Sequence, residues 1–481
     1  MVIQLQRSDI QAKVEQATAL KRSLTDFVYD AEGEVATALE SFSAEQLSRW
    51  AKPNLAGLNR TRLAVDMFLT EGSVGTRSVI DFFIQSEADL SGDEQAMLQR
   101  WQRGFNGLFV VREVIADSFR LMNWLTEKTY RVWATDDQSS ELLNRISPGE
   151  IVMTRLLPVD DSAWMLSGPL TLLGKLGKPK LAVAIGNFKK WFPHHLYGDA
   201  PELKEAAWDS VRQQYEDFVD LFGGEQVTLS GHELNKKFQV YQEKATEAQM
   251  AAAGIDGEKS IKEAAKESGV SDEEIAEAMA AVGAESAAAK ALLESPKAMK
   301  MVMPKASLPD EFRSADAVTV FVHPRWGQTL RKDYAKLEAA IAASNSSDPQ
   351  AQDSQAQDSQ AQDSQAQDSQ AQDSQAQIDR IVQKYLEDEQ VNAHVWHSIA
   401  KAHPEPLEAS LRRVLNNSQF EIERDLDDAI ARHGKPLTPE LPESASVPVH
   451  LHNLFQEAIA AVGKAEKPKK AKKAKKKAGF G

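Results

Sequence analysis

The pattern of apolar and polar positions changes along this chain, and one stretch stands apart from the rest. Between residues 104 and 174, short β-branched and aromatic runs, such as 109–111 and 129–133, are separated by turn-forming residues. About five such runs at this spacing are typical of a small barrel or a strongly bent sheet. The pattern therefore predicts a five-stranded antiparallel barrel-like unit.

Helical periodicity dominates on both sides of this stretch. Apolar residues recur three and four positions apart in 8–48, 201–222 and 378–414, as on one face of a helix. Pro201 opens one of these segments and Gly223 follows its end, which is the usual polarity of helix boundaries. The expected fold class is thus α+β, mainly helical, with one small barrel-like unit, a disordered linker and a disordered tail.

Composition shifts and linkers divide the chain further. A strand predicted at 317–322 has no obvious neighbour, so it is expected to pair with the barrel-like unit or with another chain. The predicted segments are an N-terminal helical region (1–104), the barrel-like unit with flanking helices (105–250), an alanine-rich helical hairpin (251–303), a strand and helix (304–347), a low-complexity spacer (348–377), C-terminal helices (378–434), a linker with a short helix (435–463) and a lysine-rich disordered tail (464–481).

The spacer contains the sequence Gln-Ala-Gln-Asp-Ser in five consecutive copies, from Gln350 to Ser374. A five-residue period rotates by about 140° per copy on a helix, so no apolar stripe forms. Alanine is the only apolar residue in the repeat, and it buries little surface. The repeats are therefore expected to form a polar, solvent-exposed spacer with marginal helix content.

Charge and cysteine content narrow the function classes. The chain has no cysteine, which excludes disulfides, thiolate metal sites and cysteine nucleophiles. It contains no apolar run near the ~20 residues that span a bilayer, and its first residues do not resemble a signal peptide. A cytoplasmic protein is expected. The net charge is −15, but residues 464–481 carry +8, so the rest carries −23 and disfavours broad contact with polyanions.

Part of the barrel-like unit resembles a known protein family. The shared pattern comprises Tyr-Arg-Val at 130–132, Ser-Pro-Gly-Glu at 147–150, Thr-Arg-Leu-Leu-Pro at 154–158 and Trp-Met-Leu-Ser-Gly at 164–168. It is similar to the β-rich region of uncharacterised bacterial proteins that often carry a cysteine-rich SEC-C zinc motif. The resemblance implies a fold and no activity. Because this chain lacks cysteine, the zinc site does not carry over.

Four side chains of the barrel-like unit are candidates for a nucleic-acid or partner surface: Arg120, Arg131, Trp133 and Arg155. Strand alternation places Arg131 and Trp133 on one face, and Tyr130 on the other. A wet Arg–Trp face would offer a stacking platform for single-stranded bases. This requires that Arg131 and Trp133 be exposed together.

The lack of catalytic motifs favours a non-enzyme without a cofactor. The sequence has no nucleotide-binding loop, no Gly-x-Ser-x-Gly elbow and no His-Glu-x-x-His motif. His394 and His397 share a helix face at i, i+3 and are weak metal candidates, but no third ligand is well placed. We therefore expect no metal, and expect His323 at the end of its strand to be structural.

The tail is the strongest electrostatic feature of the chain. Its lysines form a cluster suited to polyanions such as nucleic acid, an anionic membrane surface or the protein's own acidic body. The candidate tail residues are Lys469, Lys470, Lys472, Lys473, Lys475, Lys476 and Lys477. The leading hypothesis is a non-catalytic, multi-module adaptor that binds a protein partner; the alternative is a nucleic-acid-associated protein that uses the barrel and the tail. The sequence leaves the oligomeric state open.

Overall fold

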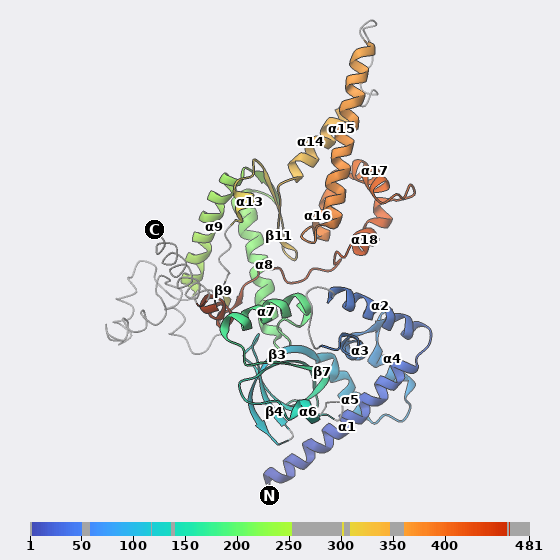
Figure 1. Cartoon of the computed structure of the whole chain (residues 1–481), viewed down its shortest axis with the longest axis vertical. Coiled ribbons are helices and arrows are strands. Elements are labelled where there is room, and N and C mark those ends of the chain that lie inside the picture. Colours follow the sequence, from blue (N-terminus) through green and yellow to red (C-terminus); the bar gives the residue numbers. More distant parts are fainter. Residues whose placement is uncertain are drawn as a thin grey trace, which may run out of the picture. The chain divides into compact units, whose positions relative to one another are not determined.

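Two folded units make up the chain in the computed structural model (Figure 1). The structure describes residues 2–50, 58–116, 118–135, 140–252, 301–302, 308–346, 360–458 and 461. Unit 1 comprises Met1–Glu205 and Pro448–Gly481, and unit 2 comprises Ala206–Val447. Unit 2 is therefore inserted in the sequence of unit 1.

Unit 1 contains helices at its N-terminal side, a barrel, and helices that follow the barrel. Its elements are α1 (Val2–Asp30), α2 (Glu34–Arg49), α3 (Arg60–Glu71), β1 (Ser73–Val74), β2 (Arg77–Ser78), α4 (Val79–Ser86), α5 (Gly92–Arg100), η1 (Trp101–Arg103), β3 (Phe105–Ile115), β4 (Ser118–Asn123), β5 (Thr129–Trp133), α6 (Ser140–Leu143), β6 (Ile151–Pro158), β7 (Ala163–Gly174), α7 (Lys178–Trp191) and η2 (Pro193–His195). Helix α8 (Pro201–Phe222) begins in unit 1 and continues into unit 2.

The structure confirms the predicted fold class, which is α+β and mainly helical with one five-stranded barrel. Its strands follow the order β3-β4-β5-β7-β6, and β3 also pairs with β6, which closes the barrel. One detail of the prediction is wrong, because β5 pairs with β7 in parallel and the barrel is mixed. A five-stranded closed barrel in this order, with a short helix after its third strand, has the topology of the OB-fold.

Side chains fill the barrel interior because alternate residues of each strand point inwards. Four aromatic rings meet there, with neighbouring centroids between 5.2 and 6.1 Å apart: Phe105, Phe109, Tyr130 and Trp164. Their tilted and edge-on contacts are the arrangements that aromatic quadrupoles favour. The interior is thus a packed core.

The N-terminal helices pack on the outer surface of the same barrel. Leu20, Leu24 and Phe83 from these helices share a buried cluster with Trp133 and Met165 from the barrel. Trp101 is fully buried in the same cluster and so packs with the barrel residues Trp133 and Met165. Strand β6 is consequently buried on both faces, which its near-continuous apolar sequence suits.

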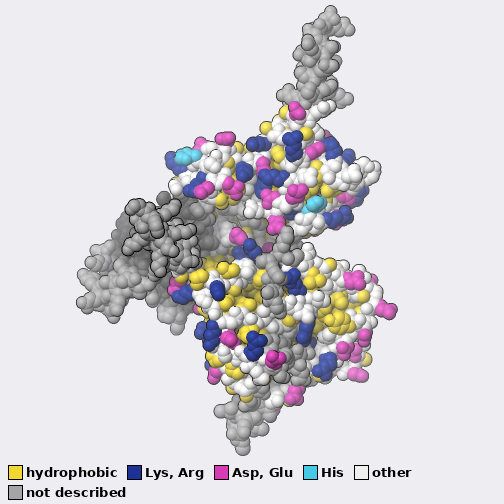
Figure 2. Space-filling model, in the orientation of Figure 1, with side chains coloured by type: hydrophobic (Ala, Val, Ile, Leu, Met, Phe, Trp, Pro, Cys, Tyr) yellow, Lys and Arg dark blue, Asp and Glu magenta, His cyan; other side chains and the backbone are white. Residues whose placement is uncertain are grey.

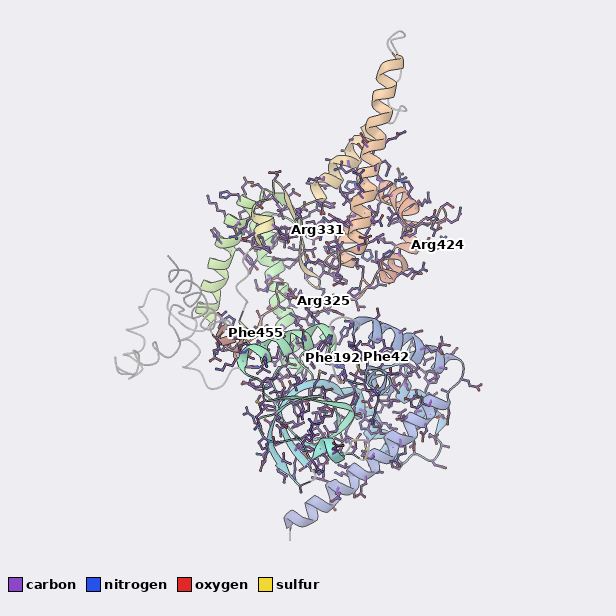
Figure 3. The ribbon with its side chains drawn as sticks, viewed as in Figure 1. Phe42, Phe192, Arg325, Arg331, Arg424 and Phe455 are labelled. Atoms are coloured by element: carbon purple, nitrogen blue, oxygen red, sulfur yellow. The ribbon has the colours of Figure 1, made fainter. Side chains whose placement is uncertain are left out.

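A helix from the C-terminal part of the chain returns to unit 1. Residues 449–458 are helical and bury Leu451, Leu454 and Ala458, which lie on one helix face. Phe455 of this helix is labelled in Figure 3. His450 Nε2 lies 3.0 Å from the carbonyl oxygen of Trp124, and Glu457 lies 2.5 Å from Lys178 at the start of α7.

Unit 2 combines a small sheet with a helical bundle. Its further elements are β8 (Gln226–Leu229), α9 (Gly231–Ala252), β9 (Met301–Val302), α13 (Asp310–Arg313), β10 (Val318–His323), β11 (Gly327–Arg331), α14 (Tyr334–Ser346), α15 (Gln360–Glu387), α16 (Ala393–Ala402), α17 (Pro404–Val414), α18 (Ile422–Arg432) and β12 (Val447–Pro448).

The strand predicted at 317–322 does not pair with the barrel. It forms β10, the central strand of an antiparallel sheet with the order β11-β10-β8. Its neighbours escaped the sequence pattern because β8 has only four residues, half-exposed, and β11 begins at Gly327. Arg331 at the end of β11 binds Asp388 just after α15, Nη2 to Oδ2 2.9 Å, and so ties the sheet to the bundle.

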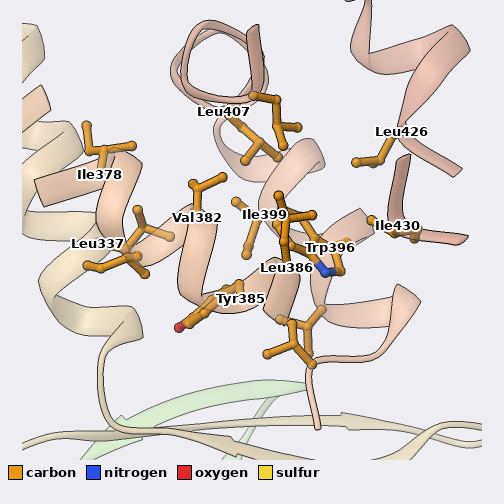
Figure 4. Close-up of a cluster of buried hydrophobic side chains, with 14 of the residues drawn as sticks. Leu337, Ile378, Val382, Tyr385, Leu386, Trp396, Ile399, Leu407, Leu426 and Ile430 are labelled. Carbon is orange, nitrogen blue, oxygen red and sulfur yellow. The ribbon is translucent and has the colours of Figure 1, made fainter. Parts of the chain in front are cut away.

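Helix α15 corrects the predicted boundary of the low-complexity spacer. The helix begins at Gln360, so the last three repeat copies are helical (Figure 1). Alanine and glutamine have good helix propensity, and the C-terminal part of α15 supplies the packing that stabilises the helix. Ile378, Val382 and Tyr385 anchor that part among the buried side chains of Figure 4.

Several predicted segments lie outside the described residues. These are most of the alanine-rich hairpin (253–300), the first two repeat copies (350–359) and the lysine-rich tail (464–481). Among the described residues, no helix combines the length and apolar composition that crossing a bilayer requires.

Candidate interaction face of the barrel

Three arginines lie on the outer face of adjacent barrel strands: Arg112 of β3, Arg120 of β4 and Arg131 of β5. All three side chains are exposed. Arg112 Nη2 contacts the sulfur of Met122 at 3.0 Å, which places its guanidinium beside the outward residues of β4. We call these three residues the arginine face. In Figure 2, basic side chains are spread over the barrel among apolar ones.

Arg120 and Arg131 are directly opposed in the antiparallel register of β4 and β5. Like charges at such positions destabilise a strand pair. Glu113 of β3 is opposed to Arg120 on its other side, but their closest atoms are 3.5 Å apart and both side chains are about half exposed, so this ion pair contributes little. With the single carboxylate of Glu113 beside them, the two guanidinium groups leave a net positive charge at the centre of the face.

Arg131 is partly held by an aromatic ring beneath it. Its guanidinium carbon lies 4.7 Å from the centroid of Trp133. This cation–π contact fixes the direction of Arg131 and offsets part of the repulsion from Arg120. The arrangement presents fixed guanidinium forks, which bind carboxylate or phosphate groups through paired hydrogen bonds.

The structure does not expose Arg131 and Trp133 together, so the predicted stacking platform is wrong. Trp133 is 4% exposed because the N-terminal helices cover it. Tyr130 and Trp164 lie inside the barrel, at 4% and 5% exposure. The aromatic rings of the face are thus unavailable to bases, while the two exposed candidates from the sequence, Arg120 and Arg131, remain. Arg112 was not predicted as a surface candidate, because its outward direction depends on the β-bulge between Val111 and Glu113.

The prediction that Arg155 belongs to this surface is also wrong, because Arg155 is completely buried. Its Nη2 lies 2.5 Å from Glu71 Oε1 and 2.6 Å from the hydroxyl of Thr70, both at the end of α3. Asp66 of the same helix lies 2.7 Å from Lys21 of α1 and accepts a hydrogen bond of 2.7 Å from Ser167 of β7. This charge network joins two helices to two barrel strands.

Glu71 connects the network to His195 of η2. The Glu71 carboxylate lies 3.1 Å from His195 Nε2, while His195 Nδ1 accepts a hydrogen bond from the backbone N–H of Asn106. Burial disfavours the charged carboxylate, but the Arg155 guanidinium and the His195 ring outweigh it and lower the pKa of Glu71 to about 2. A carboxylate held so strongly in the ionised form is a poor proton carrier near neutral pH. We therefore assign the network a structural role, which is to hold these helices against the barrel strands.

The structure gives His394 and His397 different partners. The ring of His394 of α16 lies tilted against that of His323 at the end of β10, with centroids 4.6 Å apart, whereas His397 contacts Asp427 of α18 at 2.8 Å. His323 Nδ1 accepts hydrogen bonds from the backbone N–H groups of Arg325 and Trp326, a structural role. In the part of the chain that the structure describes, no three His, Asp or Glu side chains are grouped as metal ligands.

The fold and the arginine face define an α+β protein with a closed barrel and an exposed cationic surface. Comparison with known proteins does not extend this description: no family model, no curated protein and no solved structure matches the chain. The resemblance of residues 109–168 to the family with the SEC-C zinc motif therefore stays a prediction.

Proposed function

We propose that this protein is a non-catalytic adaptor that binds an acidic segment of a protein partner on the arginine face. The observation that carries the proposal is the direct opposition of Arg120 and Arg131 across β4 and β5. This placement costs stability in the free protein, and a bound carboxylate between the two guanidinium groups would offset that cost.

Charge and size favour a short acidic segment as the partner. The arginine face spans three neighbouring strands and is bordered by Glu113, so it suits a ligand of few residues. Residues 1–463 carry a net charge of −23, which repels a long polyanion wherever it extends beyond the face. A side-chain-directed contact is also the mode open to a closed barrel, since closure leaves no unpaired strand edge.

The nucleic-acid alternative rests on the topology of the barrel. In OB-folds, the face of the second and third strands binds oligonucleotides and oligosaccharides, and Arg120 and Arg131 lie on the corresponding strands. This is an analogy at the level of fold, and one fold serves many functions. The burial of Trp133, Tyr130 and Trp164 removes the stacking contacts on which base binding would depend.

The test is binding of the full chain to a labelled poly-glutamate peptide and to oligothymidylate at low and moderate salt. Arg120→Gln combined with Arg131→Gln should weaken peptide binding at least ~10-fold, since each lost charge-assisted contact is worth about 1.5–3 kcal/mol. Arg22→Gln, which removes an exposed charge from α1, is the matched control and should leave binding unchanged.

Two results would contradict the proposal. Equal peptide binding by the double variant and the control would show that the arginine face is not the site. Tighter binding of oligothymidylate than of poly-glutamate, lost in the double variant, would replace the acidic protein segment with nucleic acid. Far-UV circular dichroism of each variant establishes that the fold is retained.

A further inference from the structure

The outward side of helix α7 carries lysines around an exposed apolar side chain. Val183 is 63% exposed, more than any other large apolar side chain that the structure describes. Lys180 lies one turn before it and Lys190 two turns after it, and both are exposed. Residues at these spacings share one face of a helix. We call these three residues the α7 ridge.

The packing of α7 on unit 1 fixes the direction of the ridge. Four apolar residues on the other side of the helix are buried, at 0% to 8% exposure: Leu181, Ile185, Phe188 and Trp191. Gly186 lies on the outward side, three positions after Val183. A Cβ on Gly186 would meet no atom within 4 Å, so the surface beside Val183 is open.

The local sequence makes this surface cationic. Residues 162–198 contain five lysines and neither aspartate nor glutamate. Lys178 is already paired, because Glu457 lies 2.5 Å from its ammonium group. Three others are exposed and make no ion pair or hydrogen bond with a described residue: Lys175, Lys180 and Lys190. Charges more than ~8–10 Å away are largely screened at physiological salt, so these lysines, and not the acidic total of the chain, decide what binds here.

We infer that the α7 ridge, together with Lys175, is a contact surface for an anionic lipid bilayer. Val183 enters the layer of lipid headgroups, and the ammonium groups around it bind lipid phosphates. Lysine suits this role because its apolar stem lies along the interface while its charge reaches the phosphates. The contact uses a helix that carries none of the arginine face, so it does not depend on the proposed function.

The side chains of α7 favour a lipid surface over nucleic acid. Binding of single-stranded bases needs exposed aromatic rings, but Phe188, Trp191 and the following Phe192 are all buried. Reading of a duplex groove needs hydrogen-bonding side chains at the centre of the helix face, where Val183 has none. A layer of lipid headgroups requires only cationic groups beside a small apolar one.

A fluorescent label on the ridge tests the inference in the full chain. The chain has no cysteine, so Val183→Cys provides a single position for an environment-sensitive fluorophore. Its emission should shift to the blue with vesicles of phosphatidylserine and phosphatidylcholine, and should not shift with vesicles of phosphatidylcholine alone. Because the label reports only its own surroundings, contacts of other parts of the chain with the vesicles do not produce the shift. A label at the exposed Arg22→Cys of α1 is the positional control and should not respond.

Charge variants of the labelled protein test the lysines. Lys180→Gln combined with Lys190→Gln should raise the lipid concentration at the midpoint of the shift about 30-fold, since each lysine near an anionic surface strengthens binding about 5-fold. Lys236→Gln combined with Lys336→Gln removes the same charge from exposed positions of α9 and α14, and should leave the midpoint unchanged. Far-UV circular dichroism of each variant checks that the fold is retained.

Four results would overturn the inference. The first is no shift of the Val183→Cys label with anionic vesicles, and the second is an equal shift with neutral ones. An equal loss of binding in the control pair would show that total charge, and not the ridge, is responsible. An equal shift with oligothymidylate or poly-glutamate in place of vesicles would replace the lipid surface with nucleic acid or an acidic protein segment.

Discussion

The guanidinium of Arg155 lies 2.5 Å, Nη2 to Oε1, from the carboxylate of Glu71 and joins the barrel strand β6 to the end of α3. Solvent stabilises neither charge well, because Arg155 is completely buried and Glu71 is only one-quarter exposed. Removing one partner of such a pair leaves the other charge in a poorly hydrated position, which costs more than the pair itself contributes.

Glu71 makes unit 1 sensitive to acid. Its pKa in the folded protein is about 2, below the ordinary value of 4.5, so its stabilising contribution is complete above pH 4.5 and is lost as the pH falls towards 2. A shift of this size corresponds to about 3 kcal/mol. Glu71→Gln should therefore lower the free energy of unfolding at pH 7, and the difference from the wild type should shrink in acid. Urea denaturation across this pH range measures it; a difference that does not vary with pH would contradict the assignment.

The turn-like backbone of β7 supplies a matched pair of glycine substitutions. Gly168 and Gly174 both have positive φ, 64° and 76°, so alanine at either position costs about 1–2 kcal/mol. At Gly168 a Cβ would also lie 2.9 Å from the buried Asp66 Oδ2, whereas at Gly174 it would meet open space. Gly168→Ala should destabilise more than Gly174→Ala by about 1–3 kcal/mol. Thermal unfolding compares them, and equal effects would show that β7 moves to relieve the contact.

Replacing either of the opposed arginines should stabilise the free protein and weaken its binding of the acidic segment. Arg120→Thr removes the repulsion with Arg131 and loses only the exposed contact with Glu113, so the free protein should gain about 0.2–1 kcal/mol. Arg131→Thr should gain less, because it also loses the contact with Trp133. Both changes are measured by urea denaturation without ligand. A loss of stability in Arg120→Thr would mean that repulsion is not felt at this position.

His394 predicts a separate pH dependence in unit 2. Burial lowers its pKa to about 4, from an ordinary 6.5, and the nearby His323 and His397 contribute in the same direction. Because the unfolded chain takes up a proton first, stability should be complete above pH 6.5 and should fall as the pH decreases towards 4. His394→Gln should flatten this decline, and the exposed His232→Gln should not. An identical pH profile in both variants would contradict the shift.

The alternation of residues predicted the barrel but not its environment. Strand parity correctly put Tyr130 on one face and Arg131 on the other, yet it could not tell which outer faces the helices cover. Arg155 shows the limit, since an arginine among apolar residues is compatible with either a wet surface or a buried ion pair. The partners that decide the matter, Asp66 and Glu71, lie over 80 positions earlier in the sequence.

Other differences have their own physical reasons. The parallel pairing of β5 with β7 depends on how the chain crosses the barrel between them, which the residues of the strands do not record. The onset of α15 at Gln360 depends on packing of its distant end around Ile378 and Tyr385, since the repeat itself has no apolar side. Neither feature can therefore be predicted from the residues at the position where it occurs.

The return of helix 449–458 to the barrel also sets the order of events during synthesis. Barrel strand β7 ends at Gly174, and the helix that packs on unit 1 leaves the ribosome 275 residues later. At a translation rate of about 5–20 residues per second, unit 1 waits roughly 14–55 s for its last helix. During that interval unit 1 lacks the contacts of His450 with Trp124 and of Glu457 with Lys178, so a nascent chain halted before residue 449 is expected to hold unit 1 less stably.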